Sequence, residues 1–317
     1  RELNGKDCFL GIDSGSTTTK IILMDSQNRI AFSHYSANNG DPVKAVRSGL
    51  LSFGTALTAA GITIRIARTA VTGYGEDLIR AAFGIDDGIV ETMAHYRAAR
   101  TFSPQVSFIL DIGGQDMKAI FINNDSVSDI QVNEACSSGC GSFLETFARS
   151  LNCDVAQFAQ LACQSDAPFD LGTRCTVFMN SKVKQARREG ASISDISAGL
   201  AYAVVKNSLY KVLKLTDVRL LGKHIVAQGG TFRNPAILRA FEILTGKEVI
   251  RPDITELMGA YGAAIIARNN YLSERTKPSS FVGFQPDMEC GANNREILNC
   301  KGCENKCRIV RVRFSNG

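Results

Sequence analysis

The feature that most constrains the fold is a strand–turn–strand unit that occurs twice in the first half of the chain. The segments CFLGIDSGSTTTKIILMD and FILDIGGQDMKAIFIN each begin with an apolar strand that ends at an aspartate, Asp13 or Asp111. A turn rich in Gly, Ser or Thr follows, and a lysine, Lys20 or Lys118, leads into a second apolar strand. Duplication of such a unit indicates two related subdomains that face a shared cleft.

The rest of the chain alternates strand-like and helix-like segments, which indicates the α/β class. Residues 62–71 have the pattern of a strand, and the apolar run HIVAQ forms a strand that leads into Gly229-Gly230-Thr231. A small-residue helix at 255–268 would approach another element closely. Further helices are expected at 42–60, 91–102, 137–151, 176–188 and 194–215, and from about 235 onward.

Composition supports a globular protein with two buried cores. The chain has 317 residues, of which 44% are hydrophobic and 21% charged. A net charge of +5 is too mild to favour a nucleic-acid partner. No stretch approaches the roughly 20 apolar residues that span a bilayer, and no secretory pattern opens the chain, so we expect a cytoplasmic protein without membrane contact. The chain begins with Arg1 rather than Met, so we expect a piece of a longer protein.

The two turns have the composition of a polyphosphate site. Glycine lets the backbone approach a ligand, and successive N–H groups form an anion-binding nest. Asp13 and Asp111 would hold Mg²⁺ through water or orient the attacking water, and Gln115 would help to place that water. The G-x-x-x-x-G-K-S/T loop does not occur, which excludes a P-loop enzyme. One such turn by itself is often an ordinary turn, but two copies, together with a third glycine turn at Gly229-Gly230-Thr231, favour a nucleotide site.

These segments resemble the superfamily of acetate and sugar kinases, heat-shock chaperones and actin. Within it they are similar to the activators of 2-hydroxyacyl-CoA dehydratases and the ATPase subunits of benzoyl-CoA reductases. The resemblance covers about residues 8–270 and implies an actin-like ATPase fold, with two duplicated RNase-H-like subdomains around a nucleotide cleft. It also implies that Asp13 and Asp111 flank Mg²⁺ and that ATP is the nucleotide. The implied nucleotide contacts are Gly15, Ser16, Thr17, Thr18, Thr19 and Lys20 on one side, Gly113 and Gly114 on the other, and Gly229, Gly230 and Glu256 near the adenosine.

Two further segments bear on the resemblance. The helix with Gly259 and Gly262 resembles the family's second connector between subdomains, although Glu256 stands where relatives often have Gln. The segment Thr72-Gly73-Tyr74-Gly75 matches a family segment but implies no particular role.

Two cysteines resemble the family's pair of iron–sulfur ligands in spacing and in flanking residues. Cys136 lies in NEACSSGCGSFLE and Cys175 in RCTVFMNS, and each is expected directly before a helix. Because a 4Fe–4S cluster usually takes four thiolates, the resemblance implies one cluster shared by two identical subunits. Ordinary buried cysteines are the alternative. Cys140, where relatives have Thr or another small residue, is a spectator, a spare thiol or a competing ligand, and we favour the first.

The resulting expectation is an ATPase that drives single electrons onto a partner enzyme. The implied partners are a ferredoxin or flavodoxin type donor and a dehydratase or reductase acceptor. The basic run Lys182, Lys184, Arg187 and Arg188 would receive an acidic donor or form an ordinary solvated helix face. A small-molecule kinase of the same superfold, acting on a sugar or carboxylate, and an ATP- and iron-dependent sensor are the alternatives.

The remaining cysteines fall into two groups. Cys8, Cys153 and Cys163 have apolar neighbours and are expected in the core. From about residue 280 the composition changes, so we expect an ATPase domain at 1–280 and a cysteine-rich extension at 281–317. The extension would hold a second metal or be a disordered remnant, and its candidate ligands are Cys290, Cys300, Cys303 and Cys307.

Overall fold

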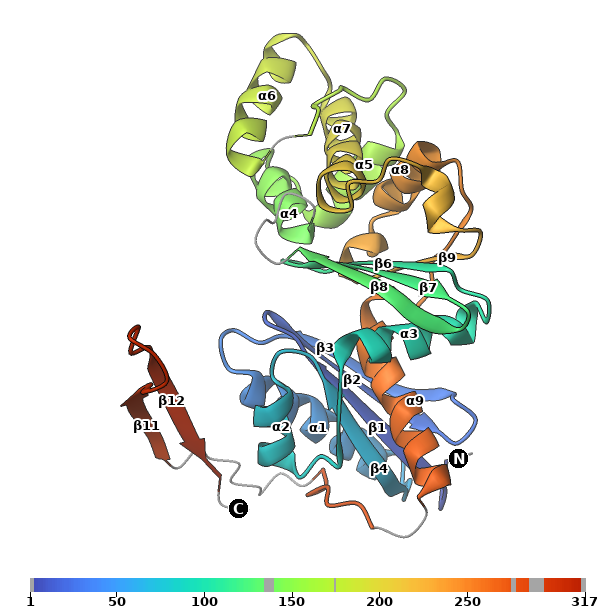
Figure 1. Ribbon diagram of the computed structural model, residues 1–317, viewed down its shortest axis with the longest axis vertical. Coiled ribbons are helices and arrows are strands. Elements are labelled where there is room, and N and C mark those ends of the chain that lie inside the picture. Colours follow the sequence, from blue (N-terminus) through green and yellow to red (C-terminus); the bar gives the residue numbers. More distant parts are fainter. Residues whose placement is uncertain (1–2, 134–139, 174, 275–277, 285–293, 315–317) are drawn as a thin grey trace. The chain divides into compact units, whose positions relative to one another are not determined.

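The computed structural model describes residues 3–133, 140–173, 175–274, 278–284 and 294–314. The chain divides into two compact units (Figure 1). Unit 1 comprises Arg1–His95 and Gly259–Gly317, and unit 2 comprises Tyr96–Met258. The chain therefore begins in unit 1, builds the whole of unit 2, and returns to unit 1.

Unit 1 contains a five-stranded sheet in the order β3-β2-β1-β4-β5. β1 pairs antiparallel with β2 and parallel with β4, so the hairpin lies beside a crossover strand. Its strands are β1 (Asp7–Ser14), β2 (Thr18–Asp25), β3 (Ile30–Ala37), β4 (Arg65–Thr72) and β5 (Asp87–Ile89), and its helices are α1 (Pro42–Ala59), α2 (Glu76–Phe83) and α9 (Met258–Ser273).

Alternation along β1 explains how this sheet is covered on both faces. Successive side chains of a strand point to opposite faces. Leu10 and Ile12 join a core with α1 and α2, whereas Gly11 lies against the backbone of α9 (Figure 1). Asp13 follows Gly11 on the α9 face. Because of its place in the strand, the Asp13 carboxylate therefore points away from the core that β1 forms with α1 and α2.

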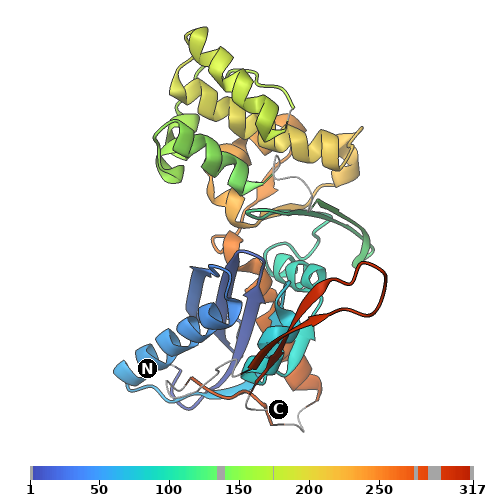
Figure 2. The same ribbon diagram turned by 90° about the vertical axis from the view of Figure 1, so that its left-hand side faces the viewer.

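Unit 2 repeats the sheet of unit 1. Read from the outer hairpin strand, its order β8-β7-β6-β9-β10 corresponds strand for strand to β3-β2-β1-β4-β5. Helices that follow the hairpin cover one face of this sheet and form a second apolar core with Phe108, Leu110 and Ile112 (Figure 2). Its strands are β6 (Phe108–Ile112), β7 (Met117–Asn123), β8 (Ser126–Asn133), β9 (Ile225–Gln228) and β10 (Val249–Ile250). The helices are α4 (Gly141–Ser150), α5 (Val155–Cys163), α6 (Thr176–Arg188), α7 (Ile193–Lys206) with a π-helical continuation (Asn207–Val212), and α8 (Pro235–Thr245), while α3 (Glu91–Phe102) runs from one unit into the other.

Most expected elements are present, with several boundaries shifted. The strand expected at 62–71 is β4, which begins at Arg65, and the helix expected at 255–268 is a 3-10 turn (Thr255–Leu257) followed by α9, which ends at Ser273. The helix expected at 137–151 begins at Gly141, after an extended Cys140. It begins there because the first amides of α4 donate to two carbonyls of another segment, as described below. The expected helices at 42–60, 91–102 and 176–188 agree closely with α1, α3 and α6. Two short helices, α2 and α5, were not expected.

The core cysteines were predicted correctly in two of three cases. Cys8 is fully buried, and burial raises the pKa of its thiol to about 11. Cys153 is half-buried against the core of unit 2. The prediction for Cys163 was wrong because this thiol is exposed. It ends α5, whose buried face is formed by Phe158, Ala159 and Ala162, and the next residue along a helix lies about 100° further round.

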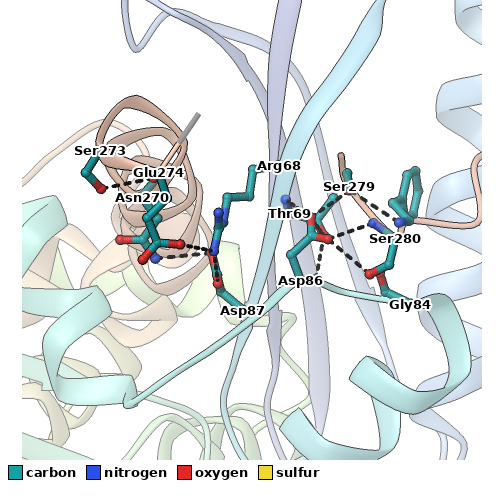
Figure 3. A network of polar contacts seen from close by, with 11 residues as sticks. Arg68, Thr69, Gly84, Asp86, Asp87, Asn270, Ser273, Glu274, Ser279 and Ser280 are labelled. Atoms are coloured by element: carbon teal, nitrogen blue, oxygen red, sulfur yellow. Dashed lines mark hydrogen bonds and ion pairs between the residues drawn. The ribbon is translucent and has the colours of Figure 1, made fainter. Parts of the chain in front are cut away.

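A polar and aromatic anchor ties the segment after α9 to unit 1. Asp86 accepts hydrogen bonds from Thr69 on β4 and from Ser279 and Ser280 beyond α9 (Figure 3). Beside it Arg68 forms a largely buried ion pair with Asp87 at 2.7 Å. Phe281, Val282 and Phe284 pack against the α1–α2 core, and the Phe284 ring lies 6.4 Å from that of Phe53. The predicted division into 1–280 and 281–317 falls inside this anchored segment and remains a prediction.

The described part of the extension ends in a two-stranded hairpin. β11 (Asn294–Asn299) pairs antiparallel with β12 (Arg308–Arg313). The loop between the strands is closed by the Cys300 amide, which donates to the Cys307 carbonyl at 2.7 Å.

Candidate functional site

The first predicted phosphate turn is a tight hairpin at the end of β1. The Gly15 amide donates to the Thr18 carbonyl at 3.0 Å and closes the turn. Antiparallel pairing places Asp13 opposite Lys20, and the lysine ammonium lies 3.1 Å from Asp13 Oδ2. The exposed Ser16 lies at the tip of the turn. The structure thus brings a basic group and a carboxylate of the predicted site together.

Asn38 stabilises this turn and was not expected from the sequence. Its side-chain amide donates to the Gly15 carbonyl at 2.7 Å, and its side-chain oxygen accepts from the Thr19 hydroxyl at 2.6 Å. Its backbone amide donates to the Thr17 carbonyl at 2.8 Å. The Asn-Asn-Gly-Asp-Pro run after β3 predicts a loop but not its contact with residues 20 positions earlier.

Asp13 is 3% exposed, and this burial is costly for a carboxylate. Within the described residues, Asp13 Oδ1 and the neighbouring Ser14 hydroxyl are buried without a hydrogen-bond partner. An unsatisfied buried polar atom costs about 1–3 kcal/mol, so such atoms mark sites where another requirement outweighs stability. An oxygen that retains its lone pairs can bind a metal-bound water or a phosphate-bound water.

The second turn has the same closure as the first. The Gly113 amide donates to the Asp116 carbonyl at 2.9 Å, and Asp111 lies opposite Lys118 in the ladder. Lys118 forms an ion pair with Asp116 at 2.7 Å. Asp111 is 7% exposed, whereas Gln115 is exposed. The duplicated unit of the sequence is therefore a duplicated three-dimensional hairpin, each copy with a buried aspartate.

The second turn is fixed by residues from two later segments. The Thr231 hydroxyl donates to the Gly113 carbonyl at 2.9 Å. The amides of Gly141 and Ser142, the first two residues of α4, donate to the carbonyls of Gly113 and Gly114 at 3.0 and 2.9 Å. α4 is therefore anchored on the turn by its N-terminal amides.

The third glycine turn is part of the same unit. Gly229 and Gly230 follow β9, and the Gly229 amide donates to the Thr255 carbonyl at 2.8 Å. The neighbouring Glu256 is mostly buried and lies 3.5 Å from the guanidinium of Arg233. The turn thus brings together the glycines and the acidic residue that the sequence assigned to the adenosine side.

The two predicted cluster ligands differ in what the structure describes. Cys136 lies outside the described residues. Cys175 is half-buried and directly precedes α6, with an extended backbone (φ −68°, ψ 163°), as expected. Cys140 is fully buried in the core of unit 2. In the described ranges, no three His, Cys, Asp or Glu side chains gather closely enough to hold a metal ion by themselves.

Three of the four C-terminal cysteines lie in the β11–β12 loop. Cys300 is half-buried, and Cys303 and Cys307 are exposed. The Gly302 amide donates to Cys300 Sγ at 3.4 Å. Cys290 lies outside the described residues.

The predicted basic run lies on α6, which begins directly after Cys175, and its Lys182 is half-buried. Arg187 and Arg188 in its last turn are exposed, as is Lys184.

Among the helices that the structure describes, none combines the length and apolar character needed to cross a bilayer.

Comparison with known proteins points to one group of ATPases. The model of the BadF/BadG/BcrA/BcrD ATPase family matches residues 10–267. The chain is 32% identical over 260 residues to the 2-hydroxyisocaproyl-CoA dehydratase activator of Clostridioides difficile, which covers 81% of this chain and 94% of the relative. It is also 32% identical over 261 residues to the (R)-2-hydroxyglutaryl-CoA dehydratase activating ATPase of Acidaminococcus fermentans, covering 81% and 96%.

A solved structure gives the same result for the fold. The activator of 2-hydroxyisocaproyl-CoA dehydratase from Clostridium difficile with bound ADPNP superposes with a TM-score of 0.72 at 29% identity, covering 84% of this chain and 97% of that one. The predicted α/β, actin-like ATPase fold is thereby confirmed.

Proposed function

The chain belongs to the BadF/BadG/BcrA/BcrD ATPase family, and we propose that it couples ATP hydrolysis to the transfer of single electrons onto a dehydratase or reductase. The observation that carries this proposal is the pair of equivalent hairpin turns, each with a buried aspartate opposite a lysine. The named relatives are a dehydratase activator and a dehydratase activating ATPase, which disfavours the kinase alternative.

The nucleotide would be held by the predicted contacts on the two turns and on the third glycine turn. Gly15 to Lys20 would bind phosphate oxygens with backbone amides, hydroxyls and the ammonium, and Gly113 and Gly114 would do so from the second turn. Gly229, Gly230 and Glu256 would lie on the adenosine side. Mg²⁺ prefers carboxylate and water ligands, and Asp13 and Asp111 have the donor chemistry to hold it through water.

Hydrolysis in this proposal depends on positioning and charge neutralisation. Asp13 offers a buried oxygen without a partner among the described residues, and this oxygen can accept a hydrogen bond from the attacking or metal-bound water. Lys20 neutralises phosphate charge, and the exposed Gln115 can orient water from the second turn.

The cluster ligands proposed are Cys136 and Cys175, each paired with its counterpart in a second copy. Cys175 fits this role because its thiol is half-buried at the start of α6, where the positive end of the helix dipole stabilises the negative charge of a reduced cluster. Two ligands per chain require a homodimer for a four-thiolate 4Fe–4S cluster, which supplies a one-electron carrier when bound. Thiolate-bound iron fits a reducing, cytoplasmic and anaerobic setting.

A covalent and hydrogen-bonded path supports coupling between nucleotide and cluster. The segment that carries Cys136 leaves β8 at Asn133, which pairs with Met117 directly after the second turn. The segment is followed by α4, whose first amides donate hydrogen bonds to the carbonyls of Gly113 and Gly114. A change in the second turn on hydrolysis would therefore move both attachment points of this segment.

Electron partners are proposed from charge and family. The exposed basic residues of α6 would receive an acidic ferredoxin or flavodoxin type donor. The acceptor would be a 2-hydroxyacyl-CoA dehydratase or related low-potential reductase. The β11–β12 loop would hold a second metal through Cys300, Cys303 and Cys307, with Cys290 as the predicted fourth ligand, because the loop brings three thiols of the predicted set onto one hairpin.

Anaerobic purification of three variants tests the cluster assignment. Cys136→Ala and Cys175→Ala should each abolish bound iron and sulfide, the visible absorbance of the cluster and ATP-dependent electron transfer. Cys163→Ala, which removes an exposed thiol outside both motifs, should retain them. Retention of iron by both ligand variants, or a wild-type protein that phosphorylates sugars or carboxylates, would overturn the proposal.

A further inference from the structure

The Thr72–Gly75 segment, to which the sequence assigned no role, lies beside the first turn. β4 runs parallel to β1 and pairs Thr72 with Asp13, so Gly73 follows directly after the strand that flanks the carboxylate. In unit 2, β9 runs parallel to β6 and pairs Gln228 with Asp111, so Gly229 follows in the same way. The duplication therefore extends beyond the two hairpins to a glycine on a third strand.

The two glycines share an unusual backbone conformation. Both Gly73 and Gly229 have φ of +92°, a region that residues with a side chain rarely adopt. Neither the sequence Thr-Gly-Tyr-Gly nor Gln-Gly-Gly-Thr shows the correspondence, because the residues around the glycines differ.

The glycines also contact equivalent atoms. A Cβ on Gly73 would lie 2.9 Å from Asp13 Oδ1 and 2.7 Å from the Ser14 carbonyl oxygen. A Cβ on Gly229 would collide with Asp111 Oδ1 and with the Ile112 carbonyl oxygen. Ser14 and Ile112 occupy the same position after the aspartate in the two strands.

The other carboxylate oxygen of Asp13, Oδ2, is also confined by a glycine. Gly259, in the first turn of α9, would place a Cβ 2.7 Å from Asp13 Oδ2. Lys20 holds that same oxygen at 3.1 Å, while Oδ1 is buried without a partner among the described residues. Two glycines and a lysine thus fix the Asp13 carboxylate without occupying its second oxygen.

We infer that Gly73 and Gly229 are equivalent positioning residues, which set the carboxylates of Asp13 and Asp111 for phosphate chemistry, and that Gly259 confines Asp13 in addition. This inference rests on the proposed roles of the two aspartates in ATP hydrolysis. A methyl group at any of these positions would displace a carboxylate by a fraction of an ångström to about 1 Å, and displacements of about 1 Å cost up to about 10²-fold in rate.

Gly259→Ala is the cleanest test, because Gly259 is helical and alanine is the better helix former. We expect kcat for ATP hydrolysis to fall by about 10–10²-fold, with nucleotide affinity and melting temperature close to those of the wild type. Gly73→Ala and Gly229→Ala should lower kcat similarly, at an additional cost in stability from the positive φ. Gly246→Ala, at φ +63° with no other atom within 4 Å of the added Cβ, controls for that backbone cost and should retain activity.

A double-mutant cycle separates positioning from general destabilisation. If Gly259 acts through Asp13, Asp13→Asn with Gly259→Ala should hydrolyse ATP no more slowly than Asp13→Asn alone. If the two substitutions lower the rate of ATP hydrolysis independently, so that their factors multiply in the double variant, the inference is wrong. Full activity of Gly259→Ala and Gly73→Ala beside an inactive Asp13→Asn would also overturn the inference but leave the proposed function intact. A wild-type protein without ATPase activity, or an unimpaired Asp13→Asn, would instead overturn the proposed function.

Discussion

The two phosphate turns have the same backbone closure but are fixed by different means. The turn of unit 1 is bound at three positions by one residue, Asn38, through its side chain and its backbone amide. The turn of unit 2 is held by Thr231 and by the N-terminal amides of α4. The first turn is therefore fixed by the residue directly after β3 of its own sheet, whereas the second is joined to the helix that follows the Cys136 segment.

This difference separates two tasks that a nucleotide-driven electron carrier must perform. A turn fixed by the loop that follows its own strands suits phosphate binding. A turn joined to a distant helix suits transmission, because a shift of its carbonyls moves the helix that bonds them. The duplicated fold supplies two equal hairpins, and their later contacts give them different uses.

The largest expected effect concerns the feature that the two turns share. Asp13→Asn and Asp111→Asn keep the shape of the side chain but remove its charge, so Mg²⁺ and the attacking water lose a carboxylate. We expect each variant to lower kcat for ATP hydrolysis by about 10²-fold or more. Phosphate release assays measure this effect.

The control for these variants is Asp125→Asn, in the exposed turn between β7 and β8. It should hydrolyse ATP at the wild-type rate. If one of the two buried aspartates proves dispensable, the turns share a shape but not a function.

Asn38→Ala should produce the next largest effect, confined to the first turn. It removes one donor and one acceptor from a nearly buried site and leaves the Gly15 carbonyl and Thr19 hydroxyl without these partners. We expect a loss of about 1–3 kcal/mol in the free energy of unfolding and about tenfold weaker nucleotide binding. Denaturant titration and nucleotide titration measure the two quantities, and exposed Asn39→Ala is the adjacent control for nucleotide binding.

Unchanged nucleotide affinity in Asn38→Ala, together with the expected loss of stability, would show that the hydrogen bonds of Asn38 serve folding and not the phosphate site.

Thr231→Val should affect the second turn more weakly, because it removes one hydrogen bond and keeps the side-chain shape. The α4 amides still hold the same turn, so we expect a loss of about 0.5–1.5 kcal/mol in unfolding free energy. ATP hydrolysis and electron transfer, measured on the same sample, sharpen the comparison. We expect the ratio of electrons transferred to ATP hydrolysed to fall, whereas Asn38→Ala should leave it constant. Equal ratios in both variants would contradict the assignment of transmission to the second turn.

The smallest effect on ATP hydrolysis is expected away from both turns, at the anchor of the segment after α9. Burial by itself raises the pKa of Asp86, but hydrogen bonds from Ser279, Ser280 and Thr69 outweigh it and lower the pKa. A lowered pKa means that Asp86 stabilises the fold fully above the unfolded value near 4. This stabilisation is lost as the pH falls through the lower folded value.

Asp86→Asn should therefore destabilise unit 1 by about 1 kcal/mol at neutral pH and remove this acid-dependent component. Melting temperatures between neutral and strongly acidic pH, compared with the wild type, test the prediction. A variant whose stability falls with acid as steeply as the wild type would assign the acid response to other carboxylates.

The sequence by itself determined the local units. Alternating apolar residues, an aspartate at the end of a strand and a glycine-rich turn specify each hairpin through short-range sterics and hydrogen bonds, so both hairpins were predicted, and the structure added that Asp13 lies opposite Lys20 and Asp111 opposite Lys118. Cys175 before α6 was predicted for the same reason, because a helix start is a local event.

Tertiary structure alone decided the contacts between segments distant in the chain. The amide of Asn38 reaches Gly15, Gly73 confines Asp13, and Gly229 confines Asp111, and none of these pairs has a pattern in the sequence. α4 begins at Gly141 and not earlier because carbonyls of the second turn accept its first amides. Local propensity leaves such boundaries and pairings open, since their energies arise only when parallel strands and helices bring residues from remote parts of the chain into contact.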